Sequence, residues 1–134
     1  MRWIVLGLIG IACGGILWWF MNNEPSHTDL AADKGFTIPA FSETATEGGE
    51  LFAVNCAQCH GPHATGSENG PPLVHKIYEP SHHGDAAFYL AAANGVRPHH
   101  WRFGPMPKVE DVDEDDVTKI IAYVRALQRA NGIN

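Results

Sequence analysis

Three residues within a stretch of five have the chemistry to hold a metal cofactor: Cys56, Cys59 and His60. In the pattern Cys-x-x-Cys-His the two thiols lie one helical turn apart, so they can form thioethers with two vinyl groups on one edge of a porphyrin, while the histidine reaches the iron. A thioredoxin-like redox pair would need a βαβ context, which is missing, and a zinc site would need a second pair of ligands. The third cysteine, Cys13, lies in an apolar segment. The motif therefore predicts one covalent haem c with His60 as an axial ligand.

The N-terminal segment has the length and composition of a membrane span. Trp3 to Met21 is a run of 19 residues without a charge, and Arg2 precedes it. As a helix this run would be roughly 28 Å long, close to the hydrocarbon thickness of a bilayer. A cleaved signal peptide would need a shorter apolar core and a small-x-small site. We expect residues 1–21 to be a single-pass anchor in a bacterial inner membrane, with the N-terminus cytoplasmic and the remainder periplasmic.

Residues 22–44 are predicted to be a periplasmic linker, because they are polar, contain Pro25 and Pro39, and follow no helical or strand period. The stretch from Phe36 to Phe41 is more apolar than a solvated tether should be. It is expected to dock either on the chain's own domain or on a partner subunit.

Helical periodicity marks the rest of the chain, residues 45–134, as an all-α domain. Short helices are predicted from Gly48 to Asn55 and from Asp85 to Ala93. A longer helix is predicted to begin after Asp113 as its N-cap and to run to about Ala130. Its apolar stripe consists of Val117, Ile120, Ile121, Val124 and Leu127.

From Thr44 onward the chain resembles the class I cytochrome c family. The residues that carry the resemblance are Gly48 and Phe52 before the haem motif, Gly70-Pro71-Pro72-Leu73, Phe103-Gly104-Pro105-Met106-Pro107, and Tyr123 on the last helix. The resemblance implies an all-α fold of three to four short helices around one covalently bound haem. It also implies that the Pro71 carbonyl accepts a hydrogen bond from Nδ1 of His60, which would orient the ring.

Met106 is the leading candidate for the sixth ligand of the iron. It lies between two prolines in the loop that resembles the family's distal loop, and outside the anchor there is no other methionine. A thioether raises the reduction potential and closes the iron to external ligands. The rival ligands are His99 and His100.

Two histidine pairs, His82-His83 and His99-His100, are not required by the family motif. In one interpretation they are surface residues or contact the haem propionates, with Trp101 and Arg102 helping to hold the propionates. In the other, some of them bind a second metal, for which copper is the first choice because imidazole binds it well. Adjacent residues of a loop rarely both face one ion, which weighs against the second interpretation.

The net charge of −6 argues against nucleic acid as a partner. The first hypothesis is an electron carrier, not an enzyme, with no small-molecule substrate. By family resemblance its partners would be a quinol–cytochrome c oxidoreductase, a terminal oxidase or a dehydrogenase, or it would be the haem subunit of a respiratory or photosynthetic complex. The alternative is a haem- or copper-binding sensor or a peroxidase-like enzyme, which needs an exchangeable sixth ligand.

Overall fold

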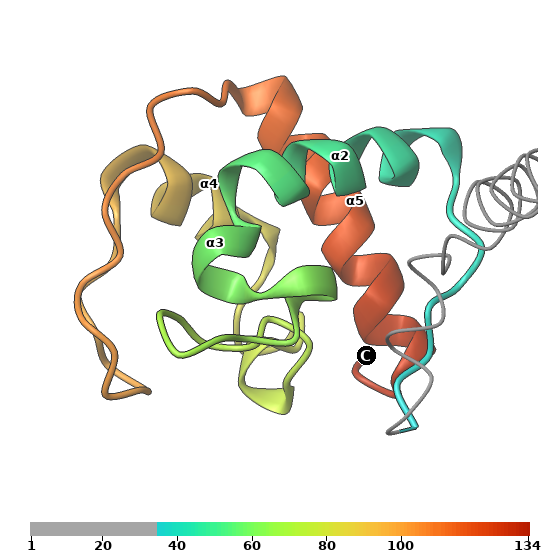
Figure 1. Cartoon of the computed structure of the whole chain (residues 1–134), viewed down its shortest axis with the longest axis horizontal. Helices are drawn as coiled ribbons and strands as arrows, with labels where there is room; N and C mark the ends of the chain where they lie inside the picture. The colour runs from blue at the N-terminus through green and yellow to red at the C-terminus, as the bar shows by residue number, and fades with distance from the viewer. Residues whose placement is uncertain (1–34) are drawn as a thin grey trace, which may run out of the picture. The chain divides into compact units, whose positions relative to one another are not determined.

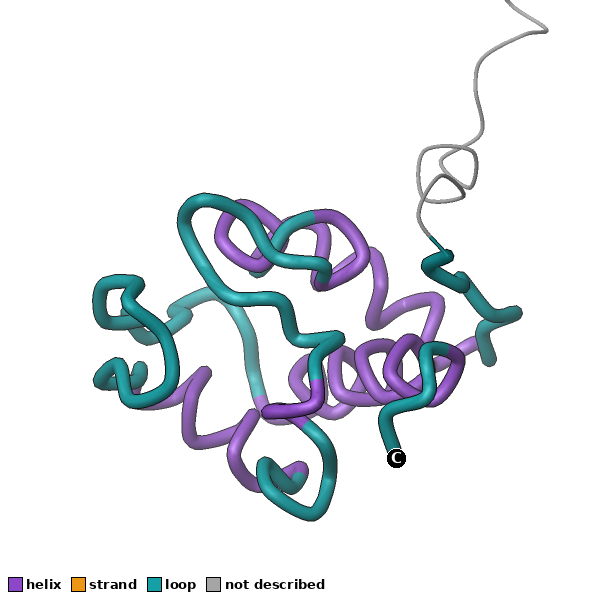
Figure 2. Tube along the Cα trace, turned by 90° about the horizontal axis from the view of Figure 1, so that it is seen from below, coloured by secondary structure: helices purple, strands orange, loops and turns teal. Residues whose placement is uncertain are grey.

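The computed structural model describes residues 35–134, where helices joined by loops make up the fold (Figure 2). The predicted all-α class is confirmed for this part of the chain, in which Thr37–Asn134 forms one compact unit. The helices are α2 (Glu43–Asn55), α3 (Ala57–His60), α4 (Asp85–Asn94) and α5 (Glu114–Ala130), with short 3₁₀ turns at Pro62–Ala64 and Lys76–Tyr78.

The predicted anchor, residues 1–21, and most of the predicted linker lie outside the described residues. Within residues 35–134 no helix is both long enough and apolar enough to cross a membrane.

Helix α2 begins at Glu43, five residues before the predicted start at Gly48 and inside the segment expected to be linker. The N-cap is Ser42, whose Oγ accepts a hydrogen bond from the backbone N–H of Ala45 at 3.2 Å. This bond satisfies one of the four amide groups that a helix start leaves without an intrahelical partner. The ordered domain therefore includes residues that composition alone assigned to the tether.

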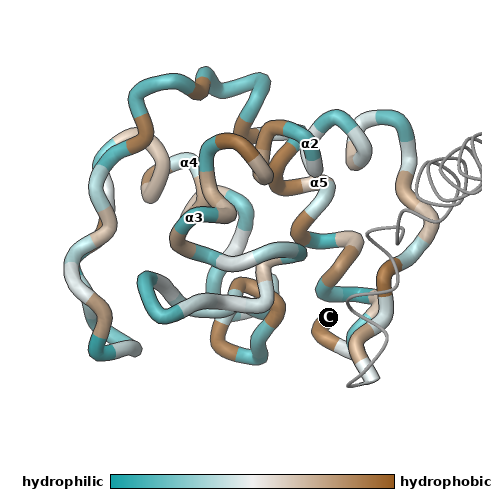
Figure 3. Tube along the Cα trace, viewed as in Figure 1, coloured by the Kyte–Doolittle hydropathy of each residue, from teal (hydrophilic) through white to brown (hydrophobic). Residues whose placement is uncertain are grey.

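Helix α5 has the predicted cap, end and apolar face. The Asp113 carboxylate accepts a hydrogen bond from the backbone N–H of Asp116 at 2.9 Å, and the Asp116 carboxylate accepts one from the backbone N–H of Asp113 at 3.3 Å. All five residues of the predicted stripe are buried, and the alternation of brown and teal along α5 in Figure 3 shows the same two-sided pattern. The stripe is thus the core-facing side of the longest helix in the described part of the chain.

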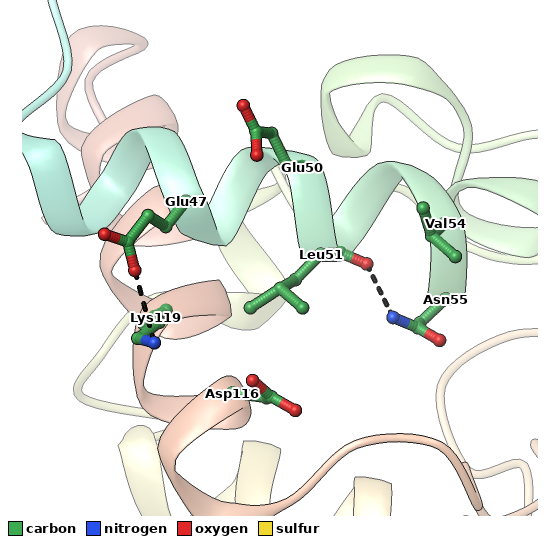
Figure 4. A pocket seen from close by; sticks show the side chains of 7 residues that line it. All are labelled: Glu47, Glu50, Leu51, Val54, Asn55, Asp116 and Lys119. Atoms are coloured by element: carbon green, nitrogen blue, oxygen red, sulfur yellow. Dashed lines mark hydrogen bonds and ion pairs between the residues drawn. The ribbon is translucent and has the colours of Figure 1, made fainter.

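Helices α2 and α5 cross closely (Figure 1). A Cβ atom added to Gly48 would overlap the carbonyl group of Lys119 and lie 2.9 Å from the backbone nitrogen of Ile120, so the two helix backbones meet at this glycine. One turn from the crossing, the Tyr123 ring lies 5.6 Å from the Phe52 ring. On the outer side, the Lys119 ammonium pairs with the Glu47 carboxylate at 3.2 Å (Figure 4). The crossing fixes α2, and with it the haem motif that follows.

The apolar segment before α2 docks on its own domain, the first of the two alternatives. The Asn131 side chain receives a hydrogen bond from the backbone N–H of Thr37 and donates one to the Thr37 carbonyl, both at 2.8 Å. The Phe41 ring lies 5.1 Å from the Tyr123 ring. These contacts join residues 37–41 to the C-terminal half of α5.

Two buried polar side chains of α5, Arg125 and Gln128, were not predicted from the sequence. The Arg125 guanidinium donates to the carbonyl groups of Tyr78 and His83 at 2.8 and 2.6 Å, and pairs with the Asp85 carboxylate at 2.8 Å. The Gln128 amide donates to the Leu73 carbonyl at 2.8 Å. Together they hold the long loop between the haem motif and α4 against α5.

Candidate haem site

The end of α2 and the single turn of α3 position the two cysteines and the histidine of the motif. The backbone N–H groups of Cys59 and His60 both donate to the Cys56 carbonyl, at 3.1 and 2.9 Å. The two thiols therefore start one helical turn apart, as covalent attachment to one porphyrin edge requires. Cys56 is half-buried and Cys59 is exposed.

Burial, and to a smaller degree the nearby Cys59 sulfur, raises the pKa of Cys56 to about 11. Cys56 is then a neutral thiol at pH 7. Reactive redox pairs and zinc-binding cysteines instead depend on thiolates, which an electropositive surrounding favours. Burial of Cys56 thus gives no sign of the electropositive surrounding that activates a reactive thiol.

The His60 ring is oriented by the loop that follows the motif. Its Nδ1 lies 2.9 Å from the Pro71 carbonyl oxygen, the contact that the family resemblance implied. A carbonyl can only accept, so Nδ1 carries the proton and Nε2 is left with its lone pair for a metal. The loop is tied to the motif in turn, because the Ser67 hydroxyl donates to the Cys59 carbonyl at 2.6 Å and the Ser67 N–H donates to the Gly70 carbonyl at 3.0 Å.

Burial lowers the pKa of His60, and its hydrogen bond to the Pro71 carbonyl opposes this shift. The net direction favours the neutral imidazole, which is the form that coordinates a metal.

Met106 lies in a loop whose backbone is closed by an isolated antiparallel β-bridge. The N–H of Val96 donates to the Met106 carbonyl and the N–H of Met106 donates to the Val96 carbonyl, both at 3.0 Å. Gly95 makes the bridge possible, because its φ of +70° suits glycine and a Cβ there would overlap the Met106 carbonyl oxygen. The Met106 side chain is half-buried. In Figure 1 this segment, in orange, lies on the side of α3 away from α5.

The indole nitrogen of Trp101 bears on whether these residues fit a haem. Its indole Nε1 is buried and has no hydrogen-bond partner among the described residues. Burial raises the pKa of Tyr78, and the nearby Trp101 indole partly offsets this shift. The indole N–H and the Tyr78 side chain are nevertheless not placed so that they form a hydrogen bond. An unpaired buried N–H costs about 1–3 kcal/mol, and a propionate carboxylate would satisfy it. Arg102, the second residue expected near the propionates, is exposed.

A cytochrome c family model matches residues 45–128, which include the motif, the Pro71 loop, Met106 and most of α5. The chain belongs to the cytochrome c family. A cytochrome c domain implies a covalently bound haem c, and members of the family are in general electron carriers.

Photosystem II extrinsic protein V from Microcystis aeruginosa is a distant relative of this cytochrome c domain. It is 28% identical over 126 residues, covering 80% of this chain and 90% of that protein. No solved structure matches the chain.

Proposed function

We propose that this chain is a membrane-anchored cytochrome c with one haem, held by His60 and Met106, that passes single electrons between redox proteins on the periplasmic side of a bacterial inner membrane. The observation that carries the proposal is the hydrogen bond between His60 and Pro71 beside the two cysteines. It leaves one imidazole nitrogen free at the place where the thioethers would fix the porphyrin.

Each residue of the site has one task in this proposal. Cys56 and Cys59 would attach the haem, His60 would bind its iron, and the Pro71 carbonyl would keep the imidazole ring from turning. Trp101 and Arg102 would donate hydrogen bonds to the propionates. Bound haem supplies the one-electron chemistry of its iron.

Met106 is the proposed sixth ligand because the bridge to Val96 fixes its backbone on both sides. A thioether held by a fixed loop would move little when the oxidation state of the iron changes, which suits electron transfer. Ligation by Met106 would also exclude external ligands, as a carrier requires and as a sensor or a peroxidase-like enzyme does not.

The ligands can be tested on the purified full-length protein. With Met106 bound, the oxidised protein shows the far-red Met–Fe(III) band and the reduced protein does not bind CO. Met106→Ala should abolish the band and admit CO while the covalent haem remains. His99→Ala and His100→Ala, which remove the rival ligands, should leave both properties unchanged. Ready CO binding by the unmodified protein would refute the carrier and favour the sensor or peroxidase-like alternative.

The proposed location rests on the apolar run of residues 3–21 and on Arg2 before it. The candidate partners are a quinol–cytochrome c oxidoreductase, a terminal oxidase, a dehydrogenase, or a larger complex of which this chain is the haem subunit. The name of the Microcystis relative, an extrinsic protein of photosystem II, supports the last of these.

Membrane fractionation tests the location and the partner together. The haem should sediment with membranes, resist extraction by salt, and be released by detergent with the partner complex attached. Haem found in the soluble fraction of intact, full-length protein would contradict the anchor.

A further inference from the structure

Three histidines from two separate loops meet on the surface of the domain. His82 and His83 precede α4, and His100 follows it. The structure brings one ligand nitrogen of each within 4.8 Å of the others. The ring centroids of His82 and His100 are 5.2 Å apart, as are those of His83 and His100. None of the three belongs to the haem motif, so the cluster needs an explanation of its own.

The spacing of two of these nitrogens suits a metal ion. Nε2 of His82 lies 3.3 Å from Nε2 of His100. Two imidazole nitrogens bound to one tetrahedral ion, each about 2.0–2.1 Å from it, are about 3.3–3.4 Å apart. The same spacing also permits a hydrogen bond if one of the two nitrogens carries a proton, so the distance alone does not decide between the two.

His83 has the secondary contact that is typical of a metal-binding histidine. Its Nδ1 donates to the Ile77 carbonyl at 2.7 Å, which fixes the ring and leaves Nε2 for coordination. The His83 carbonyl accepts a hydrogen bond from the buried Arg125 guanidinium at 2.6 Å. The histidine is therefore held in place through both its side chain and its backbone, as a preformed ligand should be.

The surroundings of His100 favour its neutral form. Desolvation, followed by the charges that His99, His83 and His82 would carry, lowers the pKa of His100. Close imidazoles cannot all be protonated without repulsion, whereas one cation bound between their lone pairs removes that repulsion.

We propose that His82, His83 and His100 form a surface site for one divalent transition-metal ion of the kind that imidazole prefers, Zn²⁺ or Cu²⁺, with water completing the coordination. Mg²⁺ and Ca²⁺ prefer oxygen ligands and are not expected to bind. His82 and His100 are exposed, so the ion can exchange with solution. A bound ion would link the loop before α4 to the loop after it. The site does not depend on the function proposed for the haem.

His99 provides a matched control within the same loop. It is an exposed histidine next to His100, with a ring centroid 4.4 Å away, but its Nδ1 contacts the Arg97 carbonyl at 2.9 Å and it is not one of the three. The assignment therefore predicts different effects for two neighbouring substitutions of the same kind.

The test is calorimetric titration of the haem-loaded, full-length protein in detergent, stripped of metal with a chelator, using ZnCl₂ and CuCl₂ in separate experiments. We expect one ion per chain. His82→Ala and His100→Ala should each weaken binding about tenfold or more, because each removes a ligand, while His99→Ala should stay within about twofold of the unmodified protein. Unchanged far-ultraviolet circular dichroism and haem absorption would show that the variants are folded.

Three results would overturn the site. The first is the absence of saturable binding of either ion to the unmodified protein. The second is an equal loss of affinity in His99→Ala and His100→Ala. The third is binding that persists when His82 and His100 are both replaced. None of these readouts involves electron transfer or CO. A failed metal titration therefore leaves the proposed function standing, and a failed test of the haem ligands leaves the metal site standing.

Discussion

Replacing Gly48 with alanine should destabilise the domain, although alanine is the better helix former. The added Cβ would overlap the carbonyl group of Lys119 and lie 2.9 Å from the Ile120 nitrogen. These are backbone atoms of α5, so no side chain can rotate away and the helices must separate by on the order of 1 Å.

The expected change in the free energy of unfolding is the difference between a packing cost and a gain in helix propensity. Overpacking in a well-packed core costs about 1–3 kcal/mol, and contact with backbone places this substitution near the upper end. The gain in helix propensity offsets about 1 kcal/mol. We therefore expect Gly48→Ala to lower the free energy of unfolding by about 2 kcal/mol, or to lower the melting temperature by about 8–16 °C for a domain of this size.

Gly49→Ala is the matched control, because it makes the same change one residue along the same helix. A Cβ at Gly49 would lie 3.1 Å from the nearest carbon of the Tyr123 ring, a side chain that can shift by a few tenths of an ångström. The propensity gain should then roughly cancel the packing cost, leaving stability within about 1 kcal/mol of the unmodified protein.

The assay is chemical denaturation of the haem-loaded protein, followed by circular dichroism and by haem absorption. If the free energy of unfolding falls with denaturant concentration at the same slope in each variant, only stability has changed. The reasoning about the helix crossing would be wrong if Gly48→Ala unfolded at the same midpoint as Gly49→Ala, or at a higher one.

Four further substitutions probe the loops and the segment that pack around α4 and α5. Gly95→Ala should displace the Met106 backbone, so the far-red band should weaken while covalent haem is retained. Arg125→Met should lower the free energy of unfolding by about 3–5 kcal/mol, since it leaves the His83 carbonyl and the Gln128 side-chain oxygen without their donor and removes one of the two donors to the Tyr78 carbonyl. Asp85→Asn, at a side chain 61% exposed, should cost less than about 1 kcal/mol; equal costs in denaturation would contradict the contacts of Arg125 with the loop. Asn131→Ala should cost about 1 kcal/mol and make the segment before α2 more sensitive to limited proteolysis; an unchanged cleavage rate would argue against the contact.

The sequence allowed the helices with strong local signals to be predicted well. The stripe and cap of α5 depend on residues three and four positions apart, and the structure has both. The predicted start of α2 was wrong because the pair Gly48-Gly49 weakens helix propensity locally. The structure explains Gly48 by its close contact with the backbone of α5, which no local sequence pattern records.

The parts of the site that could not be predicted depend on contacts between distant segments. Arg125 follows Ile121 by one turn and lies on the buried side of α5. Two of its partners are backbone carbonyl groups of a distant loop, which leave no trace in the sequence. The histidine cluster joins residues 18 positions apart. The sequence shows two histidine pairs. In the structure, ligand nitrogens of three of these four histidines lie close together, and His99 is not one of the three.

The contact between Thr37 and Asn131 determines where a pulling force would act on the domain. Tension arriving along the chain from the N-terminal side would reach this pair of hydrogen bonds, at the C-terminal end of α5, before it reached α2. The load would be carried by the α2–α5 crossing, and Cys56 and Cys59 lie beyond it along the chain. A pull on the chain would therefore strain the contacts that hold residues 37–41 and α2 before it strained the bonds that Cys56 and Cys59 would form with a haem.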